Sequence, residues 1–179
     1  MGYRCRWIAL RGRDRDDVLA KLKFAIETEL DEEVYDPGLY AVDVGAWLVI
    51  IGDGWDYMDL VTRRAAARLS TRGEVLYLYT DDTPMSAELT SFVDGQVSWS
   101  LTYESDGTYK PVVEGTLPPE GKPILGACLK AQKEAGPKAD TDHVYDVVAE
   151  LGRALVGFRH DQTLSSGKYL PIYQLKAAS

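Results

Sequence analysis

The sequence predicts an α+β protein in which helices cover one face of an antiparallel sheet. The N-terminal half is expected to have a ferredoxin-like order, βαββαβ, followed by a β-hairpin and C-terminal helices. Short apolar runs of strand length alternate with segments whose apolar residues recur at helical spacing. The 179 residues, 45% apolar and 27% charged, suit a single domain over 1–179, with 1–82 and 83–179 as its sub-layers.

The first elements follow from local patterns. Residues 3–10 are predicted as a strand, and residues 14–24 as a helix whose early aspartates complement its positive end. The acidic stretch 25–38 ends in Asp-Pro-Gly and is predicted as an exposed loop or ragged helix. Residues 40–44 and 46–51 then form a hairpin around Gly45.

The middle of the chain supplies the remaining elements of the N-terminal half and a second hairpin. A helix is predicted over 57–69, capped by Asp56, and a strand over 74–80. Asp94-Gly95 separates two β-prone runs, 85–93 and 96–104, and is a strong hairpin signal.

The C-terminal part is expected to mix strand and helix. A strand is predicted over 110–117 and helices over 124–134 and 143–156, the last ending at Gly157. Residues 169–175 are predicted as a final short strand.

Charge and composition narrow the function classes. A net charge of −8 argues against nucleic-acid binding, which needs cations to displace phosphate counterions, and favours a basic protein partner. No apolar run is long enough for a membrane span, so we expect a cytoplasmic protein without a membrane role. Cys5 and Cys128 lack metal-site spacing and are interpreted as buried thiols.

Catalytic motifs are sparse. The two histidines, His143 and His160, flank one predicted helix and would lie about 25 Å apart, too far to share a metal ion. His160 stands in Arg159-His160-Asp161, where a carboxylate beside an imidazole can fix its tautomer, although capping of the helix end also explains it.

No metal or cofactor is expected. Asp53, Asp56 and Asp59 lack the spacing of a calcium loop, and phosphate-binding, dinucleotide-binding and serine-nucleophile motifs do not occur.

Aromatic and acidic residues point instead to protein binding. Eleven tyrosines and four tryptophans give many rings with a polar end, which suits interfaces as well as sheet packing. Trp55, beside a turn, is the candidate for an exposed anchor. The acidic stretch supplies the other candidate partner-binding residues, Glu29, Glu32, Glu33 and Tyr35, although a solvated loop also explains it.

Three segments carry a resemblance to small bacterial α+β proteins without an assigned activity. These are the first strand with Trp7, the hairpin 93–100 (Val-Asp-Gly-Gln-Val-Ser-Trp-Ser), and the helix end Gly157-Phe-Arg-His-Asp161. The general profile is similar to that of bacterial immunity proteins, which are compact acidic proteins that block a toxin enzyme. This similarity implies a basic toxin or enzyme as partner and transfers no catalytic residue.

The first functional hypothesis is therefore an acidic, immunity-type binding module. One alternative is a small hydrolase or transferase in which His160 acts as base, Asp161 or Asp146 orients it, and Arg159 holds an anionic substrate. Another is a structural homodimer joined along an open sheet edge. The sequence leaves the oligomeric state open.

Overall fold

A computed structural model describes residues 4–30, 37–136, 141–160 and 171–178. Along the chain the strands are β1 (Arg4–Arg11), β2 (Phe24–Leu30), β3 (Gly38–Val44), β4 (Trp47–Asp53), β5 (Val75–Asp81), β6 (Ser86–Val93), β7 (Gln96–Glu104), β8 (Val112–Gly115) and β9 (Ile172–Ala177). The helices are α1 (Arg15–Leu22), α2 (Trp55–Met58), α3 (Arg63–Leu69), α4 (Gly121–Ala135) and α5 (Asp146–Val156).

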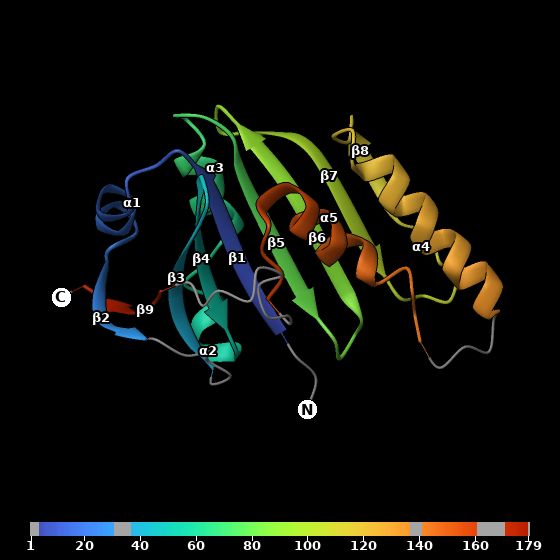
Figure 1. Ribbon diagram of the computed structural model, residues 1–179, viewed down its shortest axis with the longest axis horizontal. Coiled ribbons are helices and arrows are strands. Elements are labelled where there is room, and N and C mark those ends of the chain that lie inside the picture. Colours follow the sequence, from blue (N-terminus) through green and yellow to red (C-terminus); the bar gives the residue numbers. More distant parts are fainter. Residues whose placement is uncertain (1–3, 31–36, 137–140, 161–170, 179) are drawn as a thin grey trace.

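The described strands form a single sheet with the order β2-β9-β3-β4-β1-β5-β6-β7-β8 (Figure 1). Every neighbouring pair is antiparallel. The predicted α+β class is therefore confirmed. The sheet runs without interruption from β5 into β6, so both halves of the chain belong to one layer.

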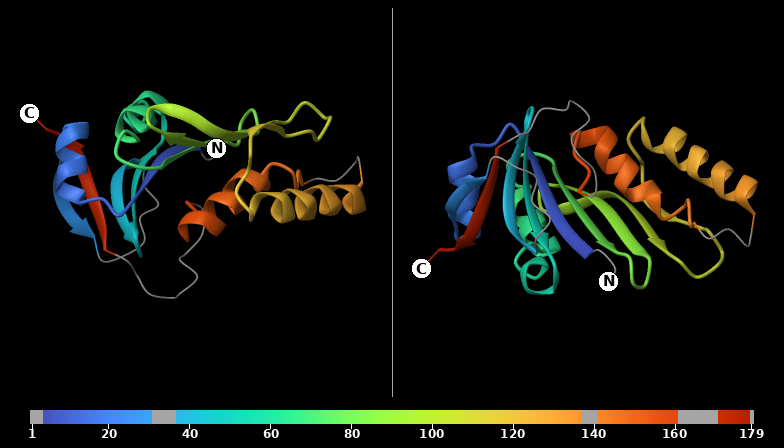
Figure 2. Two further views of the ribbon diagram at one scale, coloured as in Figure 1. Left: turned by 90° about the horizontal axis from the view of Figure 1, so that it is seen from above. Right: turned by 60° about the horizontal axis from the view of Figure 1, so that its bottom comes forward.

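Helices pack on both faces of this sheet, which corrects the prediction of a single covered face. Figure 2 shows α4 and α5 on one side and α2 and α3 on the other. The physical reason lies in the central strands: residues 5–10 of β1 are nearly all buried, whereas a strand with one wet face would alternate buried and exposed positions. The four consecutive buried positions 7–10 require cover on both sides.

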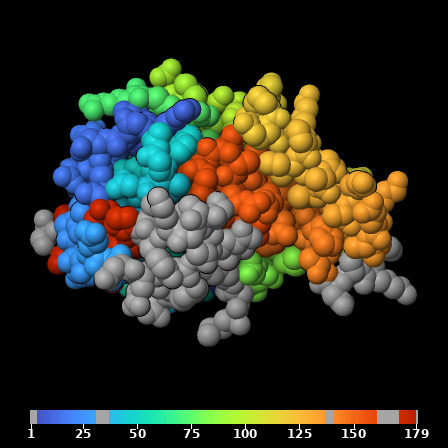
Figure 3. All heavy atoms as spheres, viewed as in Figure 1, coloured from blue at the N-terminus to red at the C-terminus, as the bar shows by residue number. Residues whose placement is uncertain are grey.

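The first face of the sheet is covered by α5, with α4 beside it over the far strands (Figure 3). Val147, Val148 and Leu151 of α5 pack on a cluster that includes Trp7 and Leu78. At Gly152 the helix comes so close to the sheet that an added Cβ would lie 3.0 Å from the Trp7 ring.

The second face carries the other core cluster. Ile8 and Ile50 of the sheet pack here with α1, through Val18 and Leu19, and with α3, which contributes Leu69. The two clusters use alternate residues of each central strand, as the pleat requires.

The ferredoxin-like order predicted for the N-terminal half is not confirmed. The observed order through β5 is βαβββααβ, because residue 24 of the predicted helix and residues 25–30 of the predicted acidic loop form the strand β2. Lys23 ends α1 with a left-handed φ of 59°, which lets the chain turn directly into this strand. The strand that pairs with β2 is β9, at the other end of the chain, so the residues next to β2 do not indicate this pairing.

The helix predicted over 57–69 is divided in two. α2 begins after Gly54, without a side-chain cap, so Asp56 does not cap a helix as predicted. α3 begins after Thr62, whose hydroxyl accepts a hydrogen bond from the Ala65 N–H at 3.1 Å. This second cap restarts the helix and leaves residues 59–62 between the two.

The remaining predicted elements are observed with small shifts of their ends. Both predicted hairpins form, β3–β4 around Gly45 and β6–β7 around Asp94-Gly95, and the strands expected over 74–80 and 110–117 are β5 and β8. The predicted C-terminal helices are α4 and α5, and Gly157 ends α5 with a left-handed φ of 80°. Within the described ranges no helix is both long and apolar enough to cross a bilayer.

Candidate functional site

The most exposed aromatic side chain named among the described large hydrophobics is Trp55, at the start of α2, with 67% of its surface accessible. Four exposed neighbours surround it on and just after this short helix: Asp56, Tyr57, Asp59 and Leu60. These five residues are called the Trp55 patch below. The intervening Met58 is buried, so α2 is fixed to the sheet by one side chain and presents the others outward.

The Trp55 ring is held in place although it is exposed. The Arg4 guanidinium carbon lies 3.6 Å from the ring centroid, and Arg4 Nε lies 3.1 Å from Asp81 Oδ2. The Gly54 N–H also donates to the Arg4 carbonyl oxygen at 3.1 Å. A ring stacked on a cation that is itself paired loses less freedom on binding than a freely rotating one.

The predicted acidic candidates are only partly described. Glu29 is exposed on the edge strand β2, three positions along the sheet from β4, which leads into Trp55. With strands about 4.8 Å apart, this separates it from β4 by roughly 14 Å. Glu32, Glu33 and Tyr35 lie outside the described residues. Pro37, the first described residue after them, packs on Gly54, where an added Cβ would lie 2.8 Å from it.

A second candidate site is a cavity of about 50 Å³ between α5 and the ends of β5 and β6. Its polar lining comes from six residues: Thr80, Asp82, Tyr145, Asp146, Arg159 and His160. The structure thus brings His160, Arg159 and Asp146 together, as the enzyme hypothesis expects. Asp161 lies outside the described residues.

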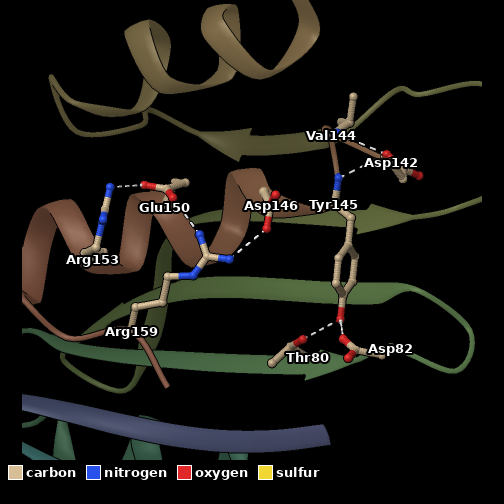
Figure 4. Close-up of polar contacts among 9 residues, drawn as sticks. All are labelled: Thr80, Asp82, Asp142, Val144, Tyr145, Asp146, Glu150, Arg153 and Arg159. Atoms are coloured by element: carbon tan, nitrogen blue, oxygen red, sulfur yellow. Dashed lines mark hydrogen bonds and ion pairs between the residues drawn. The ribbon is translucent and has the colours of Figure 1, made fainter. Parts of the chain in front are cut away.

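Arg159 folds back on α5 and joins two of its carboxylates (Figure 4). Its Nη2 lies 2.8 Å from Asp146 Oδ1 and its Nη1 lies 2.5 Å from Glu150 Oε1. Asp146 and Glu150 are four residues apart on one helix, where like charges repel, so the guanidinium stabilises their arrangement. With its side chain only 9% exposed, Arg159 has a structural role here.

Tyr145 connects the start of α5 to β5 and the following turn (Figure 4). Its hydroxyl donates to Asp82 Oδ1 at 2.7 Å, and it lies 2.5 Å from Thr80 Oγ1. Because the tyrosine proton is directed to the carboxylate, Thr80 is the donor in the second contact. Burial and the Asp82 carboxylate raise the pKa of Tyr145, so its ring stays neutral at physiological pH.

The Cys128 thiol is not activated. Burial, followed by the charges of Asp146 and Glu150, raises its pKa, which is the opposite of what nucleophilic catalysis needs. Cys5 is fully buried. Throughout the described ranges no three His, Cys, Asp or Glu side chains are grouped to hold a metal ion, and His143 and His160 stand at opposite ends of α5.

Sequence reasoning missed Arg4, Tyr145 and Asp82. Arg4 precedes Trp55 by 51 positions, and Tyr145 follows Asp82 by 63, so nothing in the local pattern connects them. The Arg4–Trp55 contact depends on the strand order, which brings β1 beside β4. The Tyr145–Asp82 contact depends on the packing of α5 over β5 and β6.

Comparison with protein-family models, with curated proteins and with solved structures finds no match.

Proposed function

We propose that this protein is an acidic, cytoplasmic, immunity-type binding module, whose Trp55 patch docks on a basic toxin or enzyme. The observation that carries the proposal is that Trp55 is 67% exposed and yet stacked on Arg4 at 3.6 Å. Rigid, exposed tryptophans are typical anchors of protein interfaces, because they bury a large area at a small entropic cost.

Charge supports a basic partner. The chain carries a net charge of −8, and the patch contributes two carboxylates. Asp59 is paired with Arg6 at 3.0 Å, whereas Asp56 is exposed beside Trp55. Negative charge around an aromatic anchor accelerates encounter with a positive surface, while the anchor slows dissociation. Cys5 and Cys128 are not joined in a disulfide, which fits a reducing compartment.

The test begins with co-purification of the tagged protein from its native cells, followed by measurement of the purified partner's affinity. Trp55→Ala is expected to lower that affinity at least thirtyfold, as hot-spot truncations of about 2 kcal/mol or more do. Leu129→Ala truncates another exposed apolar side chain, 39% accessible and on α4, and as the control should leave the affinity unchanged.

Charge reversal at Glu29, Glu32 and Glu33 tests the acidic stretch separately. We expect a slower association and a weaker salt dependence.

A purified partner that binds Trp55→Ala as tightly as the wild type removes the Trp55 patch from the interface. Unchanged affinity and unchanged salt dependence after charge reversal remove the acidic stretch.

A second candidate function is a small hydrolase or transferase at the His160 cavity. The observation that favours it is that His160 shares this cavity with Asp82 and Asp146, an imidazole beside two carboxylates. The cavity of about 50 Å³ holds a few waters and is several times smaller than the roughly 300–1,000 Å³ typical of small-molecule sites, so this function ranks second. Hydrolysis of chromogenic esters or phosphates that is lost in His160→Gln, with Asp82→Asn shifting its pH profile, would favour it.

A structural homodimer remains the third proposal. It is supported by the edge strand β8, whose four residues are all exposed, Val112 by 60%. Unprotected edges of this kind pair readily with a second strand. A native mass of one chain, unchanged in Val112→Lys, would exclude it.

A further inference from the structure

A groove of about 270 Å³ lies on the opposite side of the sheet from α5, between α1 and the end of α3. The two helices meet there directly. Arg68 Nη2 of α3 donates to the Lys21 carbonyl oxygen of α1 at 3.3 Å, and Arg72 Nη1 lies 3.6 Å from Asp17 Oδ2. The walls of the groove, α1 and the end of α3, are therefore held together by direct contacts.

The charged lining of this groove has the opposite sign to the protein. Among the described residues, four cationic side chains line it, from Arg13, Lys21, Arg68 and Arg72, against the single carboxylate of Asp17. This leaves three positive charges in a chain whose net charge is −8. A concentration of one sign in a concave site raises the local concentration of counter-ions.

Ion pairs within the protein compensate only part of this positive charge. Lys21 is hydrogen-bonded to Asp17, and Arg72 lies near the same carboxylate. Lys21, Arg72 and Arg13 together hold the pKa of Asp17 below its usual range, with the Lys21 hydrogen bond as the largest cause. One carboxylate thus serves three cations.

Arg13 has donor capacity left over. Its Nη2 is buried and has no hydrogen-bond partner among the residues that the structure describes. A buried guanidinium nitrogen without an acceptor costs free energy. Because the Arg13 side chain lines the groove, a rotation of its guanidinium would let it pair with an oxyanion there.

The floor of the groove is apolar. Leu10, Val18 and Leu69 line it, and all three belong to the core cluster of this face. A cationic rim above an apolar floor suits a ligand with one charged group and one apolar group.

We propose that this groove binds a small organic phosphate. Its phosphate lies between Arg13, Arg68 and Arg72, whose planar guanidinium groups match phosphate oxygens in pairs. Its organic part lies over Leu10, Val18 and Leu69. The groove and the Trp55 patch share no residue, so this inference stands or falls independently of the proposed protein partner.

The experiment uses the full chain with five probes: inorganic phosphate, phenyl phosphate, adenosine 5′-monophosphate, adenosine and a short single-stranded oligonucleotide. Calorimetry gives the affinities, and amide chemical shifts locate the site. At least one of the two organic phosphates should bind saturably, about tenfold or more tighter than inorganic phosphate, with shifts confined to residues around α1 and α3. Adenosine, without the phosphate, should not bind.

Arg68→Gln and Arg72→Gln should each weaken binding at least fivefold, because each removes a charged donor. Lys130→Gln makes the same change in net charge on the exposed side of α4 and should leave binding unchanged. Thermal unfolding of each variant confirms that it is folded.

Four results overturn the proposal. They are the absence of saturable binding by either organic phosphate up to about 1 mM, equal binding of inorganic phosphate, an equal loss in Lys130→Gln, and far tighter binding of an oligonucleotide at the same residues. The last result would make a nucleic acid the occupant.

Discussion

Arg4 lies over the ring of Trp55, with its guanidinium carbon 3.6 Å from the ring centroid. The contact joins the first residue of β1 to the first residue of α2, and the ion pair from Arg4 to Asp81 extends it to the end of β5. An exposed aromatic residue is thereby tied to the frame of the sheet, as a preorganised binding surface requires.

Trp55 should contribute little to stability. Because it is 67% exposed, Trp55→Ala should change the free energy of unfolding by no more than about 1 kcal/mol, mostly through the lost Arg4 contact. Trp7→Ala, at a fully buried position beneath α5, should cost about 3–5 kcal/mol. Urea denaturation of the two variants measures both values. Equal losses would contradict the structural distinction between an anchor and a core residue.

Arg159 should be coupled to Glu150. Because the Arg159 side chain is only 9% exposed, its contact with Glu150 is weakly screened by water. A double-mutant cycle with Arg159→Gln and Glu150→Gln should therefore give about 1–2 kcal/mol, with Asp146 and Arg153 remaining as the second partners. The exposed pair Lys130–Glu134 on α4 is the matched control and should give less than about 0.5 kcal/mol. A coupling as small as that of the control would show that Arg159 is not a structural clamp.

The buried Tyr77 should make the free energy of unfolding fall at alkaline pH. Burial raises the pKa of its hydroxyl from 10.0 to about 12, so the folded state holds the proton more tightly than the unfolded chain. The contribution is fully present below pH 10 and is lost as the pH rises from 10 towards 12, by up to about 2–3 kcal/mol.

Unfolding by urea at a series of pH values measures this loss for Tyr77, and absorbance of ionised tyrosine follows the titration. Tyr77→Phe should flatten the decline between pH 10 and 12. A wild-type stability that is constant across this window would contradict the burial of the ring.

Cys128 should react slowly with alkylating reagents. Its pKa is raised by burial and by Asp146 and Glu150, while Arg159 opposes this effect. At about pH 8 iodoacetamide should modify it more slowly than a free thiol, and Arg159→Gln should slow it further. Mass spectrometry of the timed reaction distinguishes Cys128 from the buried Cys5. A faster reaction in the variant would contradict the charge arrangement around α5.

Features coded by neighbouring residues were predictable from the sequence. The hairpin at Asp94-Gly95 follows from two residues that accept positive φ, here 49° and 78°. The end of α5 at Gly157 follows from the same property.

Features that depend on distant partners were not predictable. β2 is rich in exposed acidic residues and becomes a strand because β9, far along the chain, pairs with it. The exposure of Trp55 was predicted from its position beside a turn, whereas its support by Arg4 depends on the sheet order. Likewise, Arg13, Lys21, Arg68 and Arg72 form one groove only because α1 and α3 meet on the same face.

The most direct measurement is amide hydrogen exchange on the protein alone and in complex with its purified partner. If the Trp55 patch is the docking surface, protection should increase over residues 53–60 and remain unchanged over β8 and over the residues that line the His160 cavity. Protection confined to β8 or to that cavity, with residues 53–60 exchanging as in the free protein, would contradict the proposed docking surface.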